Sequence, residues 1–297
     1  MIPGNFFFFW TGQDFQYIHY LCVLSLLKTN SIQRCEIWHE EEPTNNPLWE
    51  SLHKNPRVTL HRIDYKELFA TAGLNPSDYE IFFSKASKVN RSDIFRYLKL
   101  FAQGGVYLDL DILVLRDLKP LLNTGFFGCF EARNTVNGAV LGARQACPIL
   151  KLCLDELLQV ANKQVTLDIA SAGPRVLSRV FWPKSKRVKI VRRLLEYADK
   201  CGLGETVIKY FPGFNRLAAG QLKDCQLYPK VFFYHYHWSE WKKIFADTPL
   251  PNSAFLIHFW GGSSSPFTQT IDKNYLKTSD SIYARSIRKI LPDELKK

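Results

Sequence analysis

Long apolar runs, internal repeats and low-complexity linkers are absent from this 297-residue sequence. A membrane-spanning helix needs roughly 20 consecutive apolar residues, and the apolar run Phe6–Trp10 is far too short, with Asp14 close behind it. The absence of a repeat excludes a solenoid or a propeller built from repeated units. At this length the chain can bury a full core, and 46% apolar with 23% charged residues is ordinary for a globular protein.

The cysteines lack any spacing that would hold a metal or a disulfide framework. They are odd in number and scattered, without a CxxC pair or a Cys/His cluster: Cys22, Cys35, Cys129, Cys147, Cys153, Cys201 and Cys225. Such a set excludes a zinc ribbon and a disulfide-stapled secreted fold. We therefore expect reduced, mostly buried thiols in a cytosolic setting.

Nucleic-acid motifs are missing too, although the chain is basic. Its net charge is +11 and its pI is near 9.3. That charge favours an anionic partner such as a nucleotide diphosphate, an anionic glycan or a membrane surface. Because no basic repeat interleaved with aromatics is present, we expect no nucleic-acid partner.

Strand and helix patterns alternate along the chain. Apolar, β-rich runs predict strands at Asn5–Trp10, Cys35–His39, Val58–Arg62 and Val106–Val114, and helical periodicity predicts helices at Tyr17–Lys28, Asp93–Gln103 and Ile149–Asn162. This alternation predicts an α/β fold with a mostly parallel sheet covered by helices. Ligands of such sheets bind at the carboxyl ends of the strands, where Trp10, Asp109 and Asp111 lie.

Two carboxylates interrupt the apolar stretch from Gly104 to Leu115. A buried strand turns alternate side chains to one face, so we expect Asp109 and Asp111 to point the same way. A buried pair of like charges is costly unless a cation or hydrogen-bond donors compensate it. Mg²⁺ and Mn²⁺ prefer such oxygen ligands. The motif is short, however, and the alternative is a strand end where two aspartates simply meet solvent.

A helix precedes this acidic strand. Asn90 or Ser92 can cap it, and Gly104-Gly105 can end it. Asp93 and Arg96 are three residues apart, so they share one helical face. The plain interpretation is a solvated salt bridge. The other is a pair that binds sugar hydroxyls, because the helix leads directly into the acidic strand.

The segments Ser92–Tyr97 and Gly104–Asp111 together resemble the signature of the DxD-containing retaining glycosyltransferases. That family includes α-1,4-galactosyl- and N-acetylglucosaminyltransferases, the yeast initiating α-1,6-mannosyltransferase and the catalytic domains of clostridial glucosylating toxins. Other segments are similar to the family in the same order: Phe9–Gly12, Val136–Ala139, Ser171–Pro174, Tyr228–Lys243 and Ile257–Trp260.

The resemblance implies a fold and a set of site residues. We expect a GT-A-type nucleotide-sugar-binding fold over residues 1–271, with a helical elaboration at about 149–220 and a basic surface segment at 272–297. A divalent cation, Mn²⁺ or Mg²⁺, is expected on Asp109, Asp111 and His258. Trp10 is expected to stack on the base, Asp109 to lie near the ribose, and Asp93 and Arg96 to bind hydroxyls of the donor sugar, with Asn137 as a further donor-binding residue. The expected catalytic residues are Asp109, Asp111 and Arg96. For His258 the alternative is a core histidine beside two aromatics.

The resemblance also implies the reaction. We expect transfer of a hexose or N-acetylhexosamine from a UDP sugar to an acceptor hydroxyl, with retention of configuration. UDP-galactose and UDP-N-acetylglucosamine are the first donors to test, followed by UDP-glucose. The acceptor is expected to be a glycan, a glycolipid or a protein.

The expected location is cytoplasmic, and a Golgi location is expected only if an amino-terminal anchor has been removed. The net positive charge and the aromatic-basic segment Trp238–Lys243 suggest peripheral contact with an anionic membrane.

Three alternatives remain open at this point. Leu108–Asp111 also resembles the nucleophile strand of haloacid-dehalogenase-type phosphatases, although those enzymes usually carry Thr or Val where this chain has Leu113. An inactive paralogue that only binds a nucleotide sugar is the second. A basic nucleic-acid-binding module is the third and the least favoured.

Overall fold

The computed structural model describes residues 1–30, 34–132, 135–163, 166–181 and 224–296, and the chain divides into two compact units. The first unit comprises Met1–Pro3, Asp64–Tyr107 and Leu121–Pro229. The second comprises Gly4–Ile63, Leu108–Pro120 and Lys230–Lys297. The single domain predicted for residues 1–271 and the basic segment predicted for 272–297 stay predictions, because compactness alone does not test independent folding.

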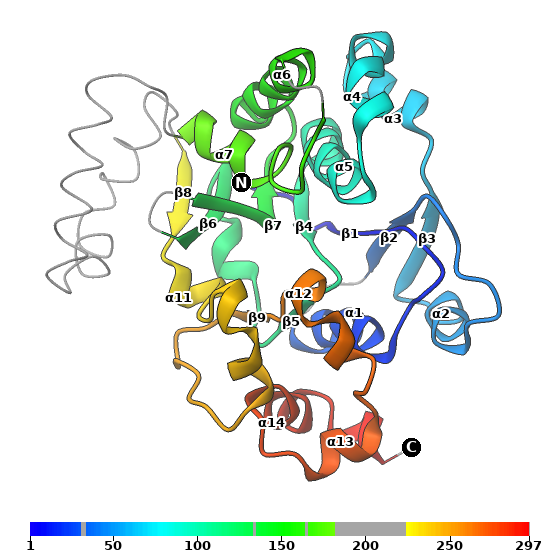
Figure 1. Ribbon diagram of the computed structural model, residues 1–297, viewed down its shortest axis with the longest axis vertical. Helices are drawn as coiled ribbons and strands as arrows, with labels where there is room; N and C mark the ends of the chain where they lie inside the picture. Colours follow the sequence, from blue (N-terminus) through cyan, green and yellow to red (C-terminus); the bar gives the residue numbers. More distant parts are fainter. Residues whose placement is uncertain (31–33, 133–134, 164–165, 182–223, 297) are drawn as a thin grey trace, which may run out of the picture. The chain divides into compact units, whose positions relative to one another are not determined.

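The second unit is built on three parallel strands in the order β3-β2-β1, and Figure 1 shows β2 and β3 side by side with α2 next to them. Strands β1 (Phe6–Trp10), β2 (Cys35–His39) and β3 (Val58–Arg62) pair in register from Phe6↔Cys35 and Cys35↔Val58. The four phenylalanines of β1 are all buried, as is typical of a parallel strand covered on both faces. Helices α1 (Tyr17–Thr29) and α2 (Pro47–His53) follow β1 and β2.

Helix α1 packs against a short strand that follows the acidic pair. Strand β5 (Ile112–Val114) contacts α1, where the Val114 N–H donates to the Ser25 hydroxyl over 2.9 Å. Strand β5 pairs antiparallel with β9 (Leu256–His258) in a separate two-stranded sheet. The remaining elements of this unit are α11 (Lys230–Phe233), η3 (Trp238–Phe245), α12 (Gly261–Thr268), α13 (Lys273–Thr278), α14 (Ile282–Ile290) and η4 (Pro292–Leu295). Helix α14 contacts both η3 and α1, so the carboxyl-terminal segment covers apolar surface as well as facing solvent.

The first unit carries strands β4 (Gly105–Leu108), β6 (Phe126–Ala132), β7 (Thr135–Ala143) and β8 (Cys225–Tyr228), in the order β4-β7-β6-β8. The last residue of β4 belongs to the second unit. Strand β6 pairs antiparallel with β7 and parallel with β8. Parallel pairing therefore predominates among these strands and those of the second unit, which confirms the predicted α/β class.

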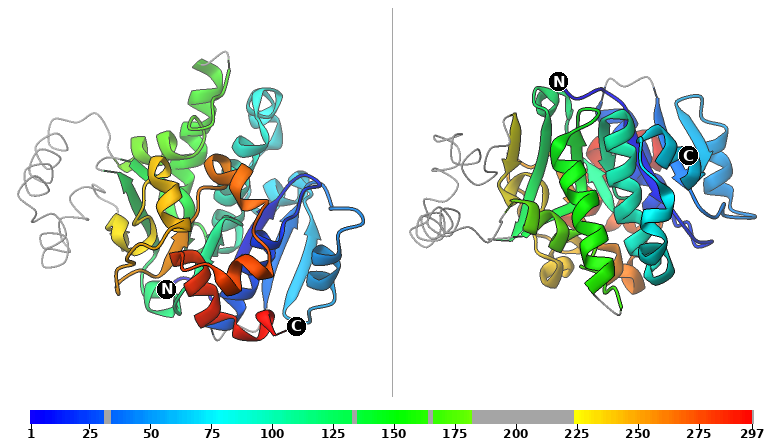
Figure 2. Two further views of the ribbon diagram at one scale, coloured as in Figure 1. Left: turned by 60° about the horizontal axis from the view of Figure 1, so that its bottom comes forward. Right: turned by 90° about the horizontal axis from the view of Figure 1, so that it is seen from above.

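Helices cover the strands of the first unit. Helix α5 (Lys88–Gln103) contacts α6 (Pro148–Lys163), and α6 contacts α7 (Pro174–Phe181), which packs on β7. Figure 2 shows α5 and α6 side by side. The shorter helical elements between β3 and β6 are α3 (Tyr65–Thr71), η1 (Pro76–Tyr79), α4 (Glu80–Lys85) and η2 (Lys119–Leu122). Of the helical elaboration predicted at about 149–220, residues 182–220 lie outside the described residues.

Helix α5 begins earlier than the sequence predicts. Its cap is Ser87, whose hydroxyl accepts the Asn90 N–H, while the Asn90 amide oxygen accepts the Ser87 N–H. Asn90 thus completes a reciprocal capping box inside the helix, and the prediction of Asn90 or Ser92 as cap was wrong. The helix ends at Gly104, as predicted, with φ of 69°.

Six of the seven cysteines are free and buried, as predicted, and Cys201 lies outside the described residues. Within the described ranges, no helix is long and apolar enough to cross a membrane.

Candidate active site

The acidic pair lies in a turn between two strands. Strand β4 ends at Leu108 and β5 begins at Ile112, whose N–H donates to the Asp109 carbonyl over 3.2 Å. The prediction of one strand through Val106–Val114 was therefore wrong, and strand alternation no longer supports the expectation that Asp109 and Asp111 point the same way. The reason is a change of partner, because β4 lies in a sheet beside β7, whereas β5 pairs with β9 in a separate two-stranded sheet.

Asp111 is held by two donors from the carboxyl-terminal part of the chain. Its Oδ2 atom lies 2.9 Å from His258 Nε2 and accepts the Gly261 N–H over 2.8 Å. Antiparallel pairing of β5 with β9 sets Ile112 opposite His258, and the Phe259 N–H donates to the Asp111 carbonyl. The structure thus brings His258 into direct contact with Asp111, while its role as a metal ligand stays a prediction.

A left-handed turn aims the Gly261 N–H at the carboxylate. Trp260 has φ of 58° and ψ of 61°, a region that bulky residues rarely adopt. Its indole N–H donates to the Tyr236 carbonyl over 2.9 Å, and its ring lies 3.9 Å from the His258 ring, centroid to centroid. A Cβ added at Gly261 would come within 3.3 Å of Asp111 Oδ2, so the close approach favours glycine there.

The surroundings keep Asp111 ionised. Burial raises the pKa of its carboxyl, but the charge of His258 and the hydrogen bonds from His258 and Gly261 lower it more, so the pKa lies below its ordinary value. An ionised carboxylate can only accept hydrogen bonds, so the proton between the two side chains belongs to His258 Nε2. Nearby, burial lowers the pKa of His19 to about 4 against the opposing charge of Asp111, and His19 is therefore neutral at pH 7.

The donor set fits a divalent cation. Asp111 Oδ1 is buried and has no hydrogen-bond partner within the described residues, as expected of a ligand atom. The part of the chain that the structure describes contains no cluster of three acidic, His or Cys side chains around one point. An ion here would thus need ligands from a substrate, as Mg²⁺ commonly takes from phosphates.

Trp10 ends β1 and packs in an aromatic group of the same unit. Its indole N–H donates to the Gly12 carbonyl, and its ring lies 5.0 Å from Phe15 and 4.9 Å from His19. The ring is half-buried, so part of its surface remains open for stacking. His19 also accepts the Gln16 N–H on Nδ1, which fixes its ring.

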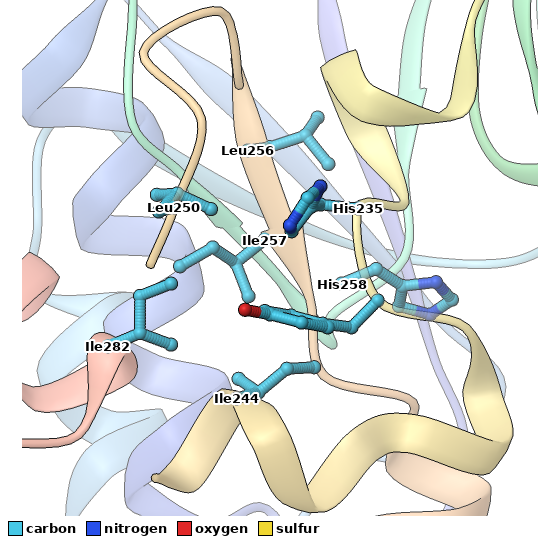
Figure 3. A pocket seen from close by; sticks show the side chains of 8 residues that line it. His235, Ile244, Leu250, Leu256, Ile257, His258 and Ile282 are labelled. Carbon is cyan, nitrogen blue, oxygen red and sulfur yellow. The ribbon is translucent and has the colours of Figure 1, made fainter. Parts of the chain in front are cut away.

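A small cavity of about 10 Å³ lies beside β9. Its walls come from His235, Tyr236, Ile244, Leu250, Leu256, Ile257, His258 and Ile282. Figure 3 shows His258 and Ile257 on opposite sides of β9, as successive residues of a strand must be. The cavity has room for about one water molecule and not for a sugar.

The first unit holds the second group of predicted residues, and both members are buried. Asp93 and Arg96 expose only 2% and 4% of their residue surface to solvent. The interpretation of this pair as a solvated salt bridge is therefore wrong. Arg96 Nη2 lies 3.3 Å from Asp93 Oδ1 and donates to the Ser92 hydroxyl over 2.8 Å. The Arg96 guanidinium also stacks 4.6 Å from the Tyr107 ring, and the Tyr107 and Ser92 hydroxyls are 2.8 Å apart.

Asn137 is tied into its own strand. Its amide N–H donates to Glu131 Oε2 over 2.9 Å, and its amide oxygen accepts the Ala139 N–H over 2.6 Å. The side chain is thus fixed at the middle of the β6–β7 hairpin. Its role toward a donor stays a prediction.

Several contacts of the candidate site residues could not be predicted from the sequence. His19, Tyr107 and Gly261 carry no local signal for the parts they play here. Gly261 acts through its backbone N–H at a distance of 150 residues from Asp111. Trp260 lies in the family-like segment Ile257–Trp260, but its left-handed backbone and its part in directing Gly261 toward Asp111 were not predicted.

Comparisons with known proteins agree with this picture. Residues 20–127 match the family described as "Glycosyltransferase sugar-binding region containing DXD motif". Lactosylceramide 4-alpha-galactosyltransferase of Mus musculus is 29% identical over 217 residues, covering 70% of this chain and 52% of that enzyme. The same enzyme of Rattus norvegicus is 25% identical over 278 residues, covering 88% of this chain and 68% of that enzyme. The chain thus spans about half the length of the mouse enzyme.

A solved structure supports the fold. The PaToxG glycosyltransferase superposes with a TM-score of 0.53 at 16% identity, covering 74% of this chain and 87% of that one. At this identity the likeness concerns the fold alone, and it confirms the predicted GT-A type.

Proposed function

We propose that the chain is a metal-dependent glycosyltransferase, because residues 20–127 match the family described as a glycosyltransferase sugar-binding region containing the DXD motif. The observation that carries the proposal is the ionised Asp111 carboxylate. His258 and Gly261 fix one of its oxygens, and the other has no hydrogen-bond partner among the described residues. The matched segment contains Asp93, Arg96, Asp109 and Asp111.

Asp111 is the proposed cation ligand that the geometry supports, with Mn²⁺ or Mg²⁺ as the ion. Asp109 and His258 are the further ligands that the resemblance implies, although the described residues contain no cluster of three such side chains around one point. When bound, the ion would neutralise charge that develops on a leaving diphosphate. Asp111 would bind through Oδ1, the atom that has no other partner within the described residues. His258 would give up the proton on Nε2 to become a ligand, since a ligating imidazole nitrogen cannot carry one.

The donor in this proposal is a UDP sugar. Trp10 would stack on the base, because its ring is anchored through its indole N–H while part of its face stays open. Asp93 and Arg96 would bind hydroxyls of the sugar, and Asn137 is a further proposed donor-binding residue. A carboxylate and a guanidinium in fixed positions supply acceptors and donors in a defined geometry, which suits a polyhydroxylated ligand.

The proposed reaction is same-face attack by the acceptor hydroxyl, with retention of configuration. This rests on the resemblance to retaining enzymes. UDP-galactose is the first donor to test because the relatives in mouse and rat are galactosyltransferases. UDP-N-acetylglucosamine and UDP-glucose follow.

The acceptor is proposed to be a glycan or a glycolipid. The relatives' names contain lactosylceramide, a glycolipid, and this chain exposes Trp238 beside the basic residues Lys242 and Lys243. A protein acceptor and the cytoplasmic location remain predictions, which acceptor screening and cell fractionation test.

The deciding experiment follows UDP release from the three UDP sugars with Mn²⁺, with chelator, and with the Asp111→Asn variant. Release should require the metal and depend on the sugar. Binding of a UDP sugar without any release, in the presence of candidate acceptors, would identify an inactive paralogue instead. Phosphate release from a generic phosphate ester without any sugar nucleotide would support the phosphatase alternative.

A further inference from the structure

Two glycines of the first unit lie against the buried Asp93–Arg96 pair. A Cβ added at Gly138, in β7, would lie 2.7 Å from Arg96 Nη1. A Cβ added at Gly173, just before α7, would lie 2.6 Å from Asp93 Oδ1. Real Cβ atoms do not approach heavy atoms this closely, so any side chain at either position would displace its neighbour.

The backbone does not explain these glycines. Positive φ angles occur at Gly12, Gly73, Gly104 and Gly105, and neither Gly138 nor Gly173 is among them. Other residue types can adopt negative φ without strain. Glycine is therefore needed at these positions for space, and the space is taken by the two polar side chains.

The pair cannot simply move aside. Arg96 donates from Nη2 to the Ser92 hydroxyl and from Nε to the Ser92 carbonyl, and its guanidinium stacks on Tyr107. Both side chains are almost fully buried, so a displaced charge would have to break these contacts without reaching water. A methyl group at either glycine would thus change where the carboxylate or the guanidinium lies.

We propose that Gly138 and Gly173 are positioning residues that set how Asp93 and Arg96 bind the donor sugar. The inference rests on the proposed function, in which this pair contacts sugar hydroxyls. Each glycine acts through one partner, Gly138 through the Arg96 guanidinium and Gly173 through the Asp93 carboxylate. Recognition of the nucleotide is expected to be independent of both glycines.

The test compares Gly138→Ala and Gly173→Ala with Gly128→Ala, a β6 glycine of the same unit. A Cβ at Gly128 would meet its nearest neighbours at 3.4 Å, an ordinary contact. Calorimetry gives the affinity for UDP and for each UDP sugar, and the ratio of the two isolates the contribution of the sugar. Both test variants should lose that contribution and lower kcat by about 10- to 100-fold, since misplacement by about 1 Å is enough. The affinity of both test variants for UDP should stay within twofold of the wild-type value. The Gly128→Ala variant should match the wild type within twofold in UDP affinity, UDP-sugar affinity and kcat.

A double-mutant cycle separates positioning from folding. In an Asp93→Ala background the carboxylate that Gly173→Ala would displace is gone, so the second substitution should cost no further activity or sugar affinity. If Gly173→Ala alone fails to fold, the double variant should fold, because the space has been restored. Additive losses, or equal losses for UDP alone, would overturn the inference.

The two proposals fail in different ways. If the wild-type chain binds every UDP sugar no better than UDP, the proposed sugar contacts of Asp93 and Arg96 are wrong, and the inference falls with them. If the sugar contributes to affinity and both glycine variants retain it, only the positioning role is wrong.

Discussion

At the scale of single residues, Asp111 presents one carboxylate oxygen to protein donors, and its other oxygen meets no donor in the part of the chain that the structure describes. His258 and Gly261 hold Oδ2, which leaves Oδ1 with a fixed direction. A carboxylate arranged in this way is ready to bind a cation without first reorganising. Under the proposed function, that preparation would offset the cost of burying this charge.

The substitution Asp111→Asn should abolish metal-dependent release of UDP while leaving the fold intact. The amide oxygen can still accept the Gly261 N–H, but the charge that binds the ion is lost. Calorimetry should show loss of Mn²⁺ binding, and thermal unfolding should show no fall in melting temperature. Asp280→Asn, which changes a well-exposed carboxylate of the same unit, is the matched control and should behave as the wild type. Full activity of Asp111→Asn, or of the wild type in chelator, would rule out the metal assignment.

Trp10 and Arg96 should differ in what their loss affects. Trp10→Ala should weaken UDP binding by about 1–3 kcal/mol, the usual worth of base stacking on an aromatic ring. Arg96→Ala should leave UDP affinity nearly unchanged and reduce turnover of the UDP sugar. Titration of each variant with UDP alone and with the UDP sugar measures the two effects. Equal losses of UDP affinity in both variants would contradict this division.

At the scale of elements, the sequence was most reliable where the pattern was local. Strands β2 and β3 were predicted to their ends, and α1 to within one residue, because their periodicity needs no distant partner. The break between β4 and β5 was missed for the opposite reason. The run from Val106 to Val114 favours a strand throughout, and only pairing with β9, far along the chain, moves Ile112–Val114 into another sheet.

The candidate site shows the same difference between what local sequence predicts and what requires distant contacts. The acidic pair, Asp93, Arg96 and His258 stood out in sequence because their residue types suggest chemistry. The supporting contacts did not, since Tyr107, Gly138 and Gly173 act by shape and closeness that require coordinates.

The glycine that ends helix α5 gives a prediction about stability. Gly104 has φ of 69° and ψ of 175°, a region that is essentially restricted to glycine. An added Cβ would also lie 2.6 Å from the backbone nitrogen of Gln145. Gly104→Ala should therefore lower the free energy of unfolding by at least about 1–3 kcal/mol. Denaturant unfolding measures this, with Gly4→Ala as control because a Cβ there meets nothing within 4 Å. Equal stability of the two variants would contradict it.

At the scale of the whole molecule, the charge of +11 matters most for partners. Basic residues near an anionic membrane contribute about 1 kcal/mol each, and salt screens them. In the second unit, Trp238 is 50% exposed, and Lys242 follows it on η3. These residues offer an aromatic and a basic contact together.

Binding to anionic vesicles should therefore be measurable at low salt and lost at high salt. Trp238→Ala and Lys242→Ala should each weaken co-sedimentation, and Lys54→Ala, an exposed lysine elsewhere in the unit, should not. Absence of binding even at low salt would remove the membrane contact from the proposal. The transferase activity would be unaffected by that result.

The hydrogen bond between Gly261 and Asp111 spans 150 residues of sequence, and this has a consequence in time. A ribosome that adds about 5–20 residues per second makes Asp111 about 8–30 s before Gly261. During that interval the nascent chain has its acidic pair without the donors that fix it. The carboxylate can be completed only after strand β9 has been synthesised and has paired with β5, so nascent chains that stop short of it should be catalytically silent.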